Sequence, residues 1–299
     1  MPEARQIGRR SAIDRIERKL KSPTHAWLIG ERRIGKTSVA KAVLARSRAA
    51  GSVALDVDLS RPGVDSPRAL AGDIARQAQA AGAGGQSSAQ KVGRLVRREH
   101  NRIKGLGDAL EGLGFEDAGE ALAAASSLLA GADDGAPGLD ATLQALALHA
   151  RAKERRVWLL LDEVHLLALV DGAERVVARW CREPGMPLVF LFSGSEESAA
   201  RELREAGRPL AAIGEEFELG GIAFDDWVPG LRSRFEEANV MIARDELFEI
   251  VKASGGHPRR TMMIAAKVHD YAGSQSERRA DATLVDLAIG EAEKDRSWS

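Results

Sequence analysis

The sequence predicts an α/β fold in which helices flank a parallel sheet and a small helical domain follows. Three observations carry this prediction. Short apolar runs end abruptly in polar or acidic residues, as buried parallel strands often do. A glycine-rich loop joins the first of these runs to a segment with helical spacing. From residue 225 onward the apolar residues recur at helical spacing, so we expect one domain over residues 1–222 and a helical lid over residues 223–299.

The glycine-rich loop follows the apolar run at residues 26–29 and reads GERRIGKT. It matches the P-loop pattern G-x-x-x-x-G-K-[ST] in the strand-loop-helix context that this motif needs. Its backbone N–H groups and the helix N-terminus together attract phosphate. We expect Lys36 to reach the β- and γ-phosphates of ATP and the Thr37 hydroxyl to bind Mg²⁺. A glycine turn that happens to carry a lysine is the alternative, which the flanking segments disfavour.

The residues of this loop are the expected nucleotide-binding residues of a P-loop NTPase. They are Gly30, Glu31, Arg32, Arg33, Ile34, Gly35, Lys36, Thr37 and Ser38. Two residues ahead of the first predicted helix, Ile7 and Gly8, allow two interpretations. They form either a simple helix start or a surface that packs against the adenine ring, and the residues alone do not decide between the two.

An acidic pair, Asp162 and Glu163, directly follows the run VWLLL at residues 157–161. Five apolar residues in a row are typical of a central strand in a parallel sheet, and the pair then lies at the strand end where ligands bind. We expect Asp162 to hold Mg²⁺, as in a Walker B element, and Glu163 to act as general base on the attacking water. Two carboxylates that cap the next helix are the alternative.

Another apolar run, residues 188–192, ends in Ser193, Gly194 and Ser195. A hydroxyl at this strand end is placed to hydrogen-bond the γ-phosphate or the water. Ser195 is also a candidate N-cap for the helix that follows, and the two roles are compatible. In an earlier apolar run, we interpret Asp56 and Asp58 as solvated strand-end residues rather than ligands.

The composition narrows the possible partners. The 299-residue chain has a formal charge of -1, so a nucleic-acid contact would need a local basic patch. The basic run at residues 91–104 is such a patch, but without interleaved aromatic residues a solvated helix face is the preferred interpretation. The single cysteine, Cys181, fits a reducing cytoplasm and is better explained as a core residue than as a nucleophile. No uncharged apolar run approaches the ~20 residues of a membrane span.

Four segments together resemble the AAA+ ATPases. GERRIGKTS, VWLLLDE, FLFSGS and SGGHPRR occur in this order, and the similarity is to the archaeal-type and STAND-like group related to origin-recognition and transposition-regulator ATPases. The resemblance covers about residues 7–268, apart from a predicted helical insertion at about 66–155. It implies a further strand between those that carry the P-loop and the acidic pair, and it implies Mg²⁺-dependent ATP hydrolysis.

The resemblance also implies roles for residues outside these two motifs. Ser195 corresponds to the sensor-1 residue, and Arg259 corresponds to sensor 2, with Arg260 as the alternative. The candidates for an arginine finger are Arg201, Arg204 and Arg208. Of these we expect Arg208, although an arginine-rich surface helix explains them equally well. A finger that acts in trans implies a homo-oligomer, because a neighbouring subunit then completes the site.

Three functions fit this sequence. The first, which we prefer, is an ATP-hydrolysing molecular switch that oligomerises and regulates a separate partner protein. The second is a DNA-associated AAA+ regulator of transposition or replication that contacts the DNA backbone. Only about 28 residues follow residue 271, too few for the winged-helix domain of origin-binding relatives, so sequence-specific recognition is not expected. The third is a nucleotide-binding scaffold with negligible turnover.

Overall fold

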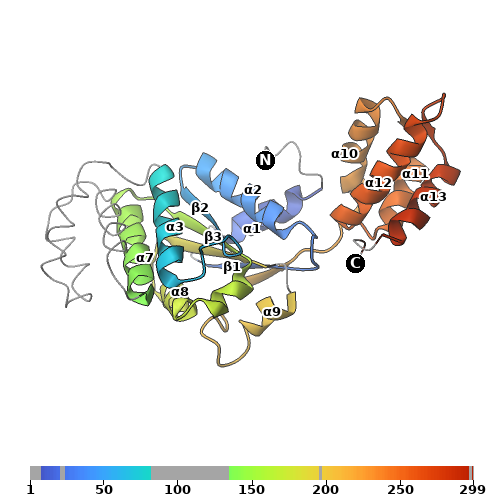
Figure 1. The fold of residues 1–299 in the computed structure, drawn as a ribbon. Coiled ribbons are helices and arrows are strands. Elements are labelled where there is room, and N and C mark those ends of the chain that lie inside the picture. The colour runs from blue at the N-terminus through green and yellow to red at the C-terminus, as the bar shows by residue number, and fades with distance from the viewer. Residues whose placement is uncertain (1–7, 21–23, 82–134, 195–196, 296–297, 299) are drawn as a thin grey trace, which may run out of the picture. The chain divides into compact units, whose positions relative to one another are not determined.

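The computed structural model describes residues 8–20, 24–81, 135–194, 197–295 and 298 (Figure 1). The described residues divide into two compact units. Unit 1 combines residues up to Asp14, Gly30–Val39, and the chain from Glu218 onward. Unit 2 contains the described parts of Arg15–Ile29 and Ala40–Phe217.

Unit 2 is built on a five-stranded sheet with the strand order β2-β3-β4-β1-β5. The strands are β1 (Ala26–Ile29), β2 (Val53–Asp58), β3 (Val157–Asp162), β4 (Leu188–Ser193) and β5 (Glu215–Glu218). The first four pair in parallel, so their carboxyl ends lie at one edge of the sheet. Because β4 lies between β1 and β3, the predicted intervening strand is confirmed.

Both faces of this sheet are buried, which explains why its central strands are apolar at nearly every position. On one face, alternate strand residues pack against three helices that form a layer (Figure 1). These helices are α3 (Pro67–Ala80), α7 (Gly135–Ala152) and α8 (Ala173–Arg182). Trp27 stacks on Phe192 with ring centroids 4.4 Å apart in this core. The α3 and α7 helices belong to the predicted helical insertion, whose basic run at residues 91–104 lies outside the described residues.

The remaining helices of the α/β part are short or are shared between the units. A 3₁₀ helix, η3 (Val164–Leu169), follows β3, and α9 (Glu197–Glu202) follows β4. The helices α1 (Arg10–Leu20) and α2 (Lys36–Ala49) begin in unit 1 and continue into unit 2. The α2 helix therefore carries the chain out of the glycine-rich loop, as the motif predicts.

The C-terminal part of unit 1 is helical. Its elements are α10 (Phe224–Glu237), β6 (Met241–Ile242), α11 (Arg244–Ala253), α12 (Pro258–Gly273), β7 (Arg279–Ala280) and α13 (Ala282–Glu293). These helices enclose their own core, in which Trp227, Leu231 and Ile264 are fully buried. Among the described residues, no helix has the length and apolar character needed to cross a bilayer. The described helices α10 to α13 thus pack around one shared core, and their assignment as a lid over residues 223–299 stays a prediction.

His25 ties the amino ends of β1 and β4 to the end of α8. Its Nδ1 accepts a hydrogen bond from the Phe190 N–H at 3.1 Å, so Nε2 carries the proton and donates to the Cys181 carbonyl at 2.9 Å. Burial lowers the pKa of His25 below its ordinary value of 6.5. The contact with Phe190 needs the neutral ring, because a protonated ring has no acceptor for the Phe190 N–H.

We therefore expect acid to destabilise the fold through His25. Below its ordinary pKa, unfolded His25 binds a proton that the folded ring resists, so the free energy of unfolding falls as pH is lowered, by at most about 1.4 kcal/mol per pH unit for one group. Urea unfolding at pH 7.5 and pH 5.5 measures the change. His25→Asn, which keeps an acceptor for Phe190 but does not titrate, should show a smaller pH dependence than wild type. An identical pH dependence in both proteins would contradict the assignment.

Candidate functional site

The loop GERRIGKT follows β1 directly and runs into α2, which begins at Lys36. Three of its residues have positive φ angles: Gly30 (140°), Arg33 (63°) and Gly35 (102°). At Gly30 a Cβ atom would lie 2.4 Å from the Leu219 carbonyl oxygen, so contact excludes a side chain there. At Gly35 the φ angle itself favours glycine. This alternation of left-handed residues is the backbone form that concave anion-binding loops use.

Lys36 lies across the inside of this loop. Its Nζ donates hydrogen bonds to the carbonyl oxygens of Gly30 at 2.6 Å and Glu31 at 2.7 Å, and the residue is only 5 % exposed. The first turn of α2 contains no acidic residue. The ammonium group and the positive end of the α2 dipole therefore act at the same place, where they favour an anion.

Arg9 supports the same loop from the N-terminal segment. Its Nη2 donates to the Ile34 carbonyl oxygen at 2.7 Å, and its buried Nε has no hydrogen-bond partner among the described residues. Burial lowers the pKa of Arg9. Gly8, with a φ of 68°, packs so closely on Ile222 that a Cβ atom would lie 2.2 Å from it. Ile7 lies outside the described residues, so the adenine contact proposed for both residues stays a prediction.

The acidic pair occupies a strained turn at the end of β3. Asp162 is buried as the last residue of the strand, and its Oδ1 accepts the Glu163 N–H at 3.2 Å. Glu163 has φ 54° and ψ 44°, a left-handed conformation that costs a non-glycine residue about 1–3 kcal/mol. Its Oε2 lies 3.5 Å from Nδ1 of His165. Such strain is often concentrated at functional sites, where it fixes the direction of a side chain.

The neighbouring strand, β4, ends at Ser193, which is 1 % exposed. Its Oγ has no hydrogen-bond partner among the described residues. The register pairs Leu161 with Phe192, so Asp162 and Ser193 follow as the last residues of adjacent strands. A buried hydroxyl without a partner is the kind of group that a phosphate or a bound water satisfies. Ser195, the predicted sensor-1 residue, lies outside the described residues and stays a prediction.

Within unit 1, the turn before α12 contacts the P-loop. His257 precedes the helix as its N-cap, and its Nε2 lies 3.0 Å from the Arg32 carbonyl oxygen. The guanidinium of Arg260 lies 3.5 Å from the Glu31 carboxylate and donates from Nε to the Trp298 carbonyl oxygen at 2.8 Å. Arg259 has a buried Nε without a hydrogen-bond partner among the described residues. The two arginines that the sequence left open thus differ in their contacts, and the assignment of sensor 2 stays a prediction.

Positive charge gathers where the P-loop meets this turn. The pKa of Arg33 is lowered by desolvation and by repulsion from Arg259 and Arg32. An anion placed near these three guanidinium groups would relieve the repulsion that lowers the pKa of Arg33. Sequence reasoning named all three, but their mutual influence depends on the fold.

A search against protein-family models and a search of curated proteins each found no match. Solved structures, in contrast, are similar over almost the whole chain. A Walker-type ATPase of Pyrococcus abyssi has a TM-score of 0.61 and 17 % identity, and the match covers 99 % of this chain and 77 % of that one. The ORC2 protein of Aeropyrum pernix, solved as ADPNP-ADP complexes, has a TM-score of 0.58 and 18 % identity, with 95 % and 68 % covered. The ORC1 protein of the same organism, solved with DNA, has a TM-score of 0.55 and 17 % identity, with 99 % and 69 % covered.

This chain has the fold of an archaeal-type AAA+ P-loop ATPase. The predicted fold class is confirmed, and the resemblance to the archaeal, origin-recognition type is confirmed at the level of the fold. At this level of identity the similarity concerns the fold, so the roles of individual residues remain proposals.

Two of the candidate arginine-finger residues, Arg208 and Arg204, contact other side chains of unit 2. Arg208 donates from Nη2 to Oε2 of Glu174 at 2.9 Å, and Glu174 is buried near the start of α8. Arg204 pairs with Glu216 and lies over the Trp27 ring at 5.2 Å from its centroid. The assignment of Arg208 as the finger stays a prediction.

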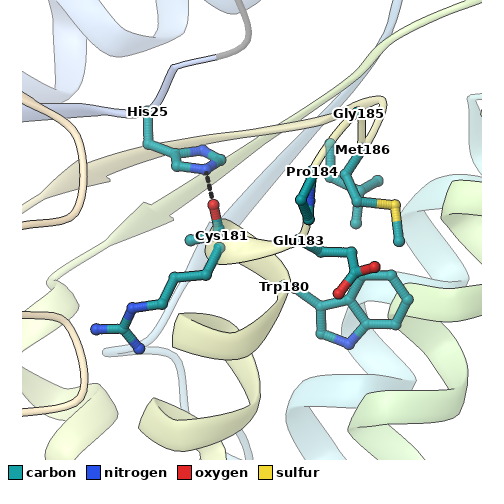
Figure 2. Close-up of a pocket in the computed structure, with 9 residues that line it drawn as sticks. His25, Trp180, Cys181, Glu183, Pro184, Gly185 and Met186 are labelled. Atoms are coloured by element: carbon teal, nitrogen blue, oxygen red, sulfur yellow. Dashed lines mark hydrogen bonds between the residues drawn. The ribbon is translucent and has the colours of Figure 1, made fainter.

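A cavity of about 230 Å³ lies in unit 2 beside His25, at the amino ends of β1 and β4 (Figure 2). Its other lining residues are Leu188 of β4 and residues from the end of α8 and the turn that follows, including Trp180, Cys181 and Met186. Burial raises the pKa of the Cys181 thiol, which favours the neutral, unreactive form and supports its interpretation as a core residue. The P-loop follows the opposite, carboxyl end of β1, so this cavity is not the predicted nucleotide site.

Proposed function

We propose that this chain is an ATP-binding and ATP-hydrolysing molecular switch. The observation that carries the proposal is the buried Lys36 ammonium inside a loop whose backbone is bent by Gly30 and Gly35. In an AAA+ fold this arrangement provides a positive cradle at the N-terminus of α2. The phosphates of ATP supply the negative charge that such a cradle stabilises.

The other site residues supply what hydrolysis needs. Thr37 and Asp162 offer a hydroxyl and a carboxylate, the hard oxygen ligands that Mg²⁺ prefers. The bound ion would neutralise charge on the phosphates. Glu163 accepts the proton of the attacking water, and Ser193 or Ser195 hydrogen-bonds the water or the γ-phosphate. Arg259 contributes positive charge from the lid side through its unsatisfied buried N–H.

Calorimetry with ATP, in the presence of Mg²⁺ and then of a chelator, tests the proposal. We expect ATP to bind and the chelator to weaken binding, and we expect slow release of phosphate in a turnover assay. If ATP does not bind at all in the presence of Mg²⁺, the proposed function is wrong. If ATP binds without any phosphate release, the chain is a nucleotide-binding scaffold.

We further propose that the active form is a homo-oligomer in which Arg208 acts on a neighbouring subunit, and that the switch regulates a separate partner protein. Arg208→Ala is expected to lower turnover at unchanged ATP affinity. It also leaves the buried Glu174 carboxylate without its partner, which costs about 1–3 kcal/mol of stability. Mixing Arg208→Ala with Glu163→Gln protomers should restore part of the turnover.

Glu174→Gln is the matched control for this prediction, because it breaks the ion pair and leaves the arginine in place. A finger role requires normal turnover in Glu174→Gln. Equal losses of turnover in both variants, without recovery in the mixture, would show that the pair acts only structurally.

A second candidate is a DNA-associated regulator that contacts the DNA backbone. It is favoured by the similarity in fold to ORC1 of Aeropyrum pernix, which was solved in complex with DNA. Backbone contacts predict that a gel shift with duplex DNA weakens by orders of magnitude between about 50 mM and about 200 mM salt. If no shift forms at the lower salt concentration, with or without ATP, this candidate is excluded.

A further inference from the structure

We propose that His257 and Arg260 of the lid hold the P-loop in its binding conformation, with His257 as the dominant contact. Because of these contacts, the lid and the P-loop move together when the nucleotide binds. The link to nucleotide rests on the proposed function. The other part of the inference, that the lid restrains the conformation of the P-loop, does not depend on the proposed function.

The first support is the membership of unit 1. Gly30–Val39 belongs to the same compact unit as the chain from Glu218 onward, although Gly30 directly follows β1 of unit 2. At Gly30 the Leu219 carbonyl oxygen occupies the space of a Cβ atom, so the two backbones approach closely there. The P-loop therefore packs against residues that lead into the lid.

The second support is the hydrogen bonding of His257. Its Nδ1 faces the Arg260 N–H at the start of α12, at 3.5 Å, so the proton is on Nε2, which donates to the Arg32 carbonyl oxygen at 3.0 Å. Burial lowers the pKa of His257, and the charge of Arg260 acts in the same direction, while Glu31 and the Arg32 carbonyl oppose it. The ring is thus neutral with its proton on Nε2, and its two nitrogens join the start of α12 to the P-loop.

The third support is the orientation of Arg260. Its Nε donates to the Trp298 carbonyl oxygen, and its guanidinium lies over the Trp298 ring at 5.8 Å from the centroid. These contacts direct the remaining nitrogens toward Glu31. The Glu31 side chain is 63 % exposed, so this ion pair contributes little by itself. The hydrogen bond from the buried His257 is therefore the stronger of the two contacts.

The P-loop needs such support because its own backbone is strained. Arg33, the residue after the carbonyl that His257 binds, has a left-handed φ of 63°. A contact that stabilises this conformation in the absence of ATP reduces the ordering cost when ATP binds. By linkage, ATP must then strengthen the contact between the lid and the P-loop by the same factor.

Two substitutions at His257 separate the contact from the helix cap. His257→Gln keeps a donor at the position of Nε2, whereas His257→Asn keeps an acceptor for the cap but is too short to reach Arg32. We expect His257→Asn to weaken ATP binding about threefold to tenfold and His257→Gln to stay close to wild type. Arg260→Ala should weaken binding less than His257→Asn does. Lys252→Ala, which removes an exposed ion pair within α11, is the control and should have no effect.

Hydrogen exchange of the nucleotide-free protein tests whether the lid restrains the conformation of the P-loop. The amides of residues 30–37 should exchange faster in His257→Asn than in wild type or His257→Gln. Unchanged exchange in His257→Asn would overturn the inference, even if wild type binds ATP. Equal changes in both variants would also overturn it, because the donor to Arg32 would then not matter. Failure of wild type to bind ATP would refute the proposed function, while the exchange data would still decide whether the lid restrains the P-loop.

Discussion

Lys36→Met is expected to weaken ATP binding by at least about 100-fold. The substitution keeps the length and packing of a side chain that is 5 % exposed but removes the ammonium group. Charge-assisted hydrogen bonds to phosphate are worth up to about 3 kcal/mol, and no other group on α2 replaces this one. Isothermal titration calorimetry with ATP and Mg²⁺ measures the loss.

Lys41→Ala is the matched control on the same helix. The Lys41 side chain is exposed and pairs with Asp56 at 3.2 Å, so its removal takes the same charge from α2 at a position away from the loop. ATP affinity should stay unchanged in this variant. If Lys36→Met bound ATP as tightly as Lys41→Ala does, the P-loop would not be the phosphate site.

Glu163→Gln is expected to reduce ATP turnover by about 100-fold or more while ATP affinity stays within about twofold of wild type. The amide has the same shape as the carboxylate but does not accept a proton from water, and general base catalysis contributes about 10²–10⁴ in rate. Phosphate release under single-turnover conditions measures the rate, and calorimetry measures the affinity.

Glu183→Gln, in the turn after α8, is the control for removing one negative charge from unit 2. It should leave turnover unchanged. Full turnover in Glu163→Gln would assign the base to another residue. A parallel loss of ATP affinity would mean that Glu163 contributes to binding rather than to the chemical step.

The central strands could be predicted because of their burial. Strands covered on both faces must be apolar throughout, so β1 and β3 are visible as uninterrupted apolar runs. β5 was missed because only Phe217 of EEFE is buried. The α8 helix was missed although its ten residues, AERVVARWCR, place apolar residues on one face and charged residues on the other.

Some residues of the candidate site could likewise be predicted from the sequence, and others could not. Residues of the P-loop and the acidic pair could be named because each motif is local in sequence. The support from Arg9 to Ile34 and from His257 to Arg32 joins residues 25 and 225 positions apart, so no local pattern reports it. The sequence shows Ser193 as a hydroxyl at a strand end. Only the structure shows that this hydroxyl is buried without a hydrogen-bond partner among the described residues, which is the reason to consider it beside Ser195.

Unit 1 is formed from segments that lie far apart in the sequence, which affects the order in which the chain folds during its synthesis. The ribosome releases Gly30–Val39 early and the segment from Glu218 onward only after all of unit 2 has been made. Unit 2 can therefore begin to fold on the nascent chain, whereas the contacts of His257 and Arg260 with residues 31–32 must wait for the last segment. Closing this long loop is cheaper once the residues between have become compact. The P-loop should consequently be among the last parts of the molecule to reach its final form.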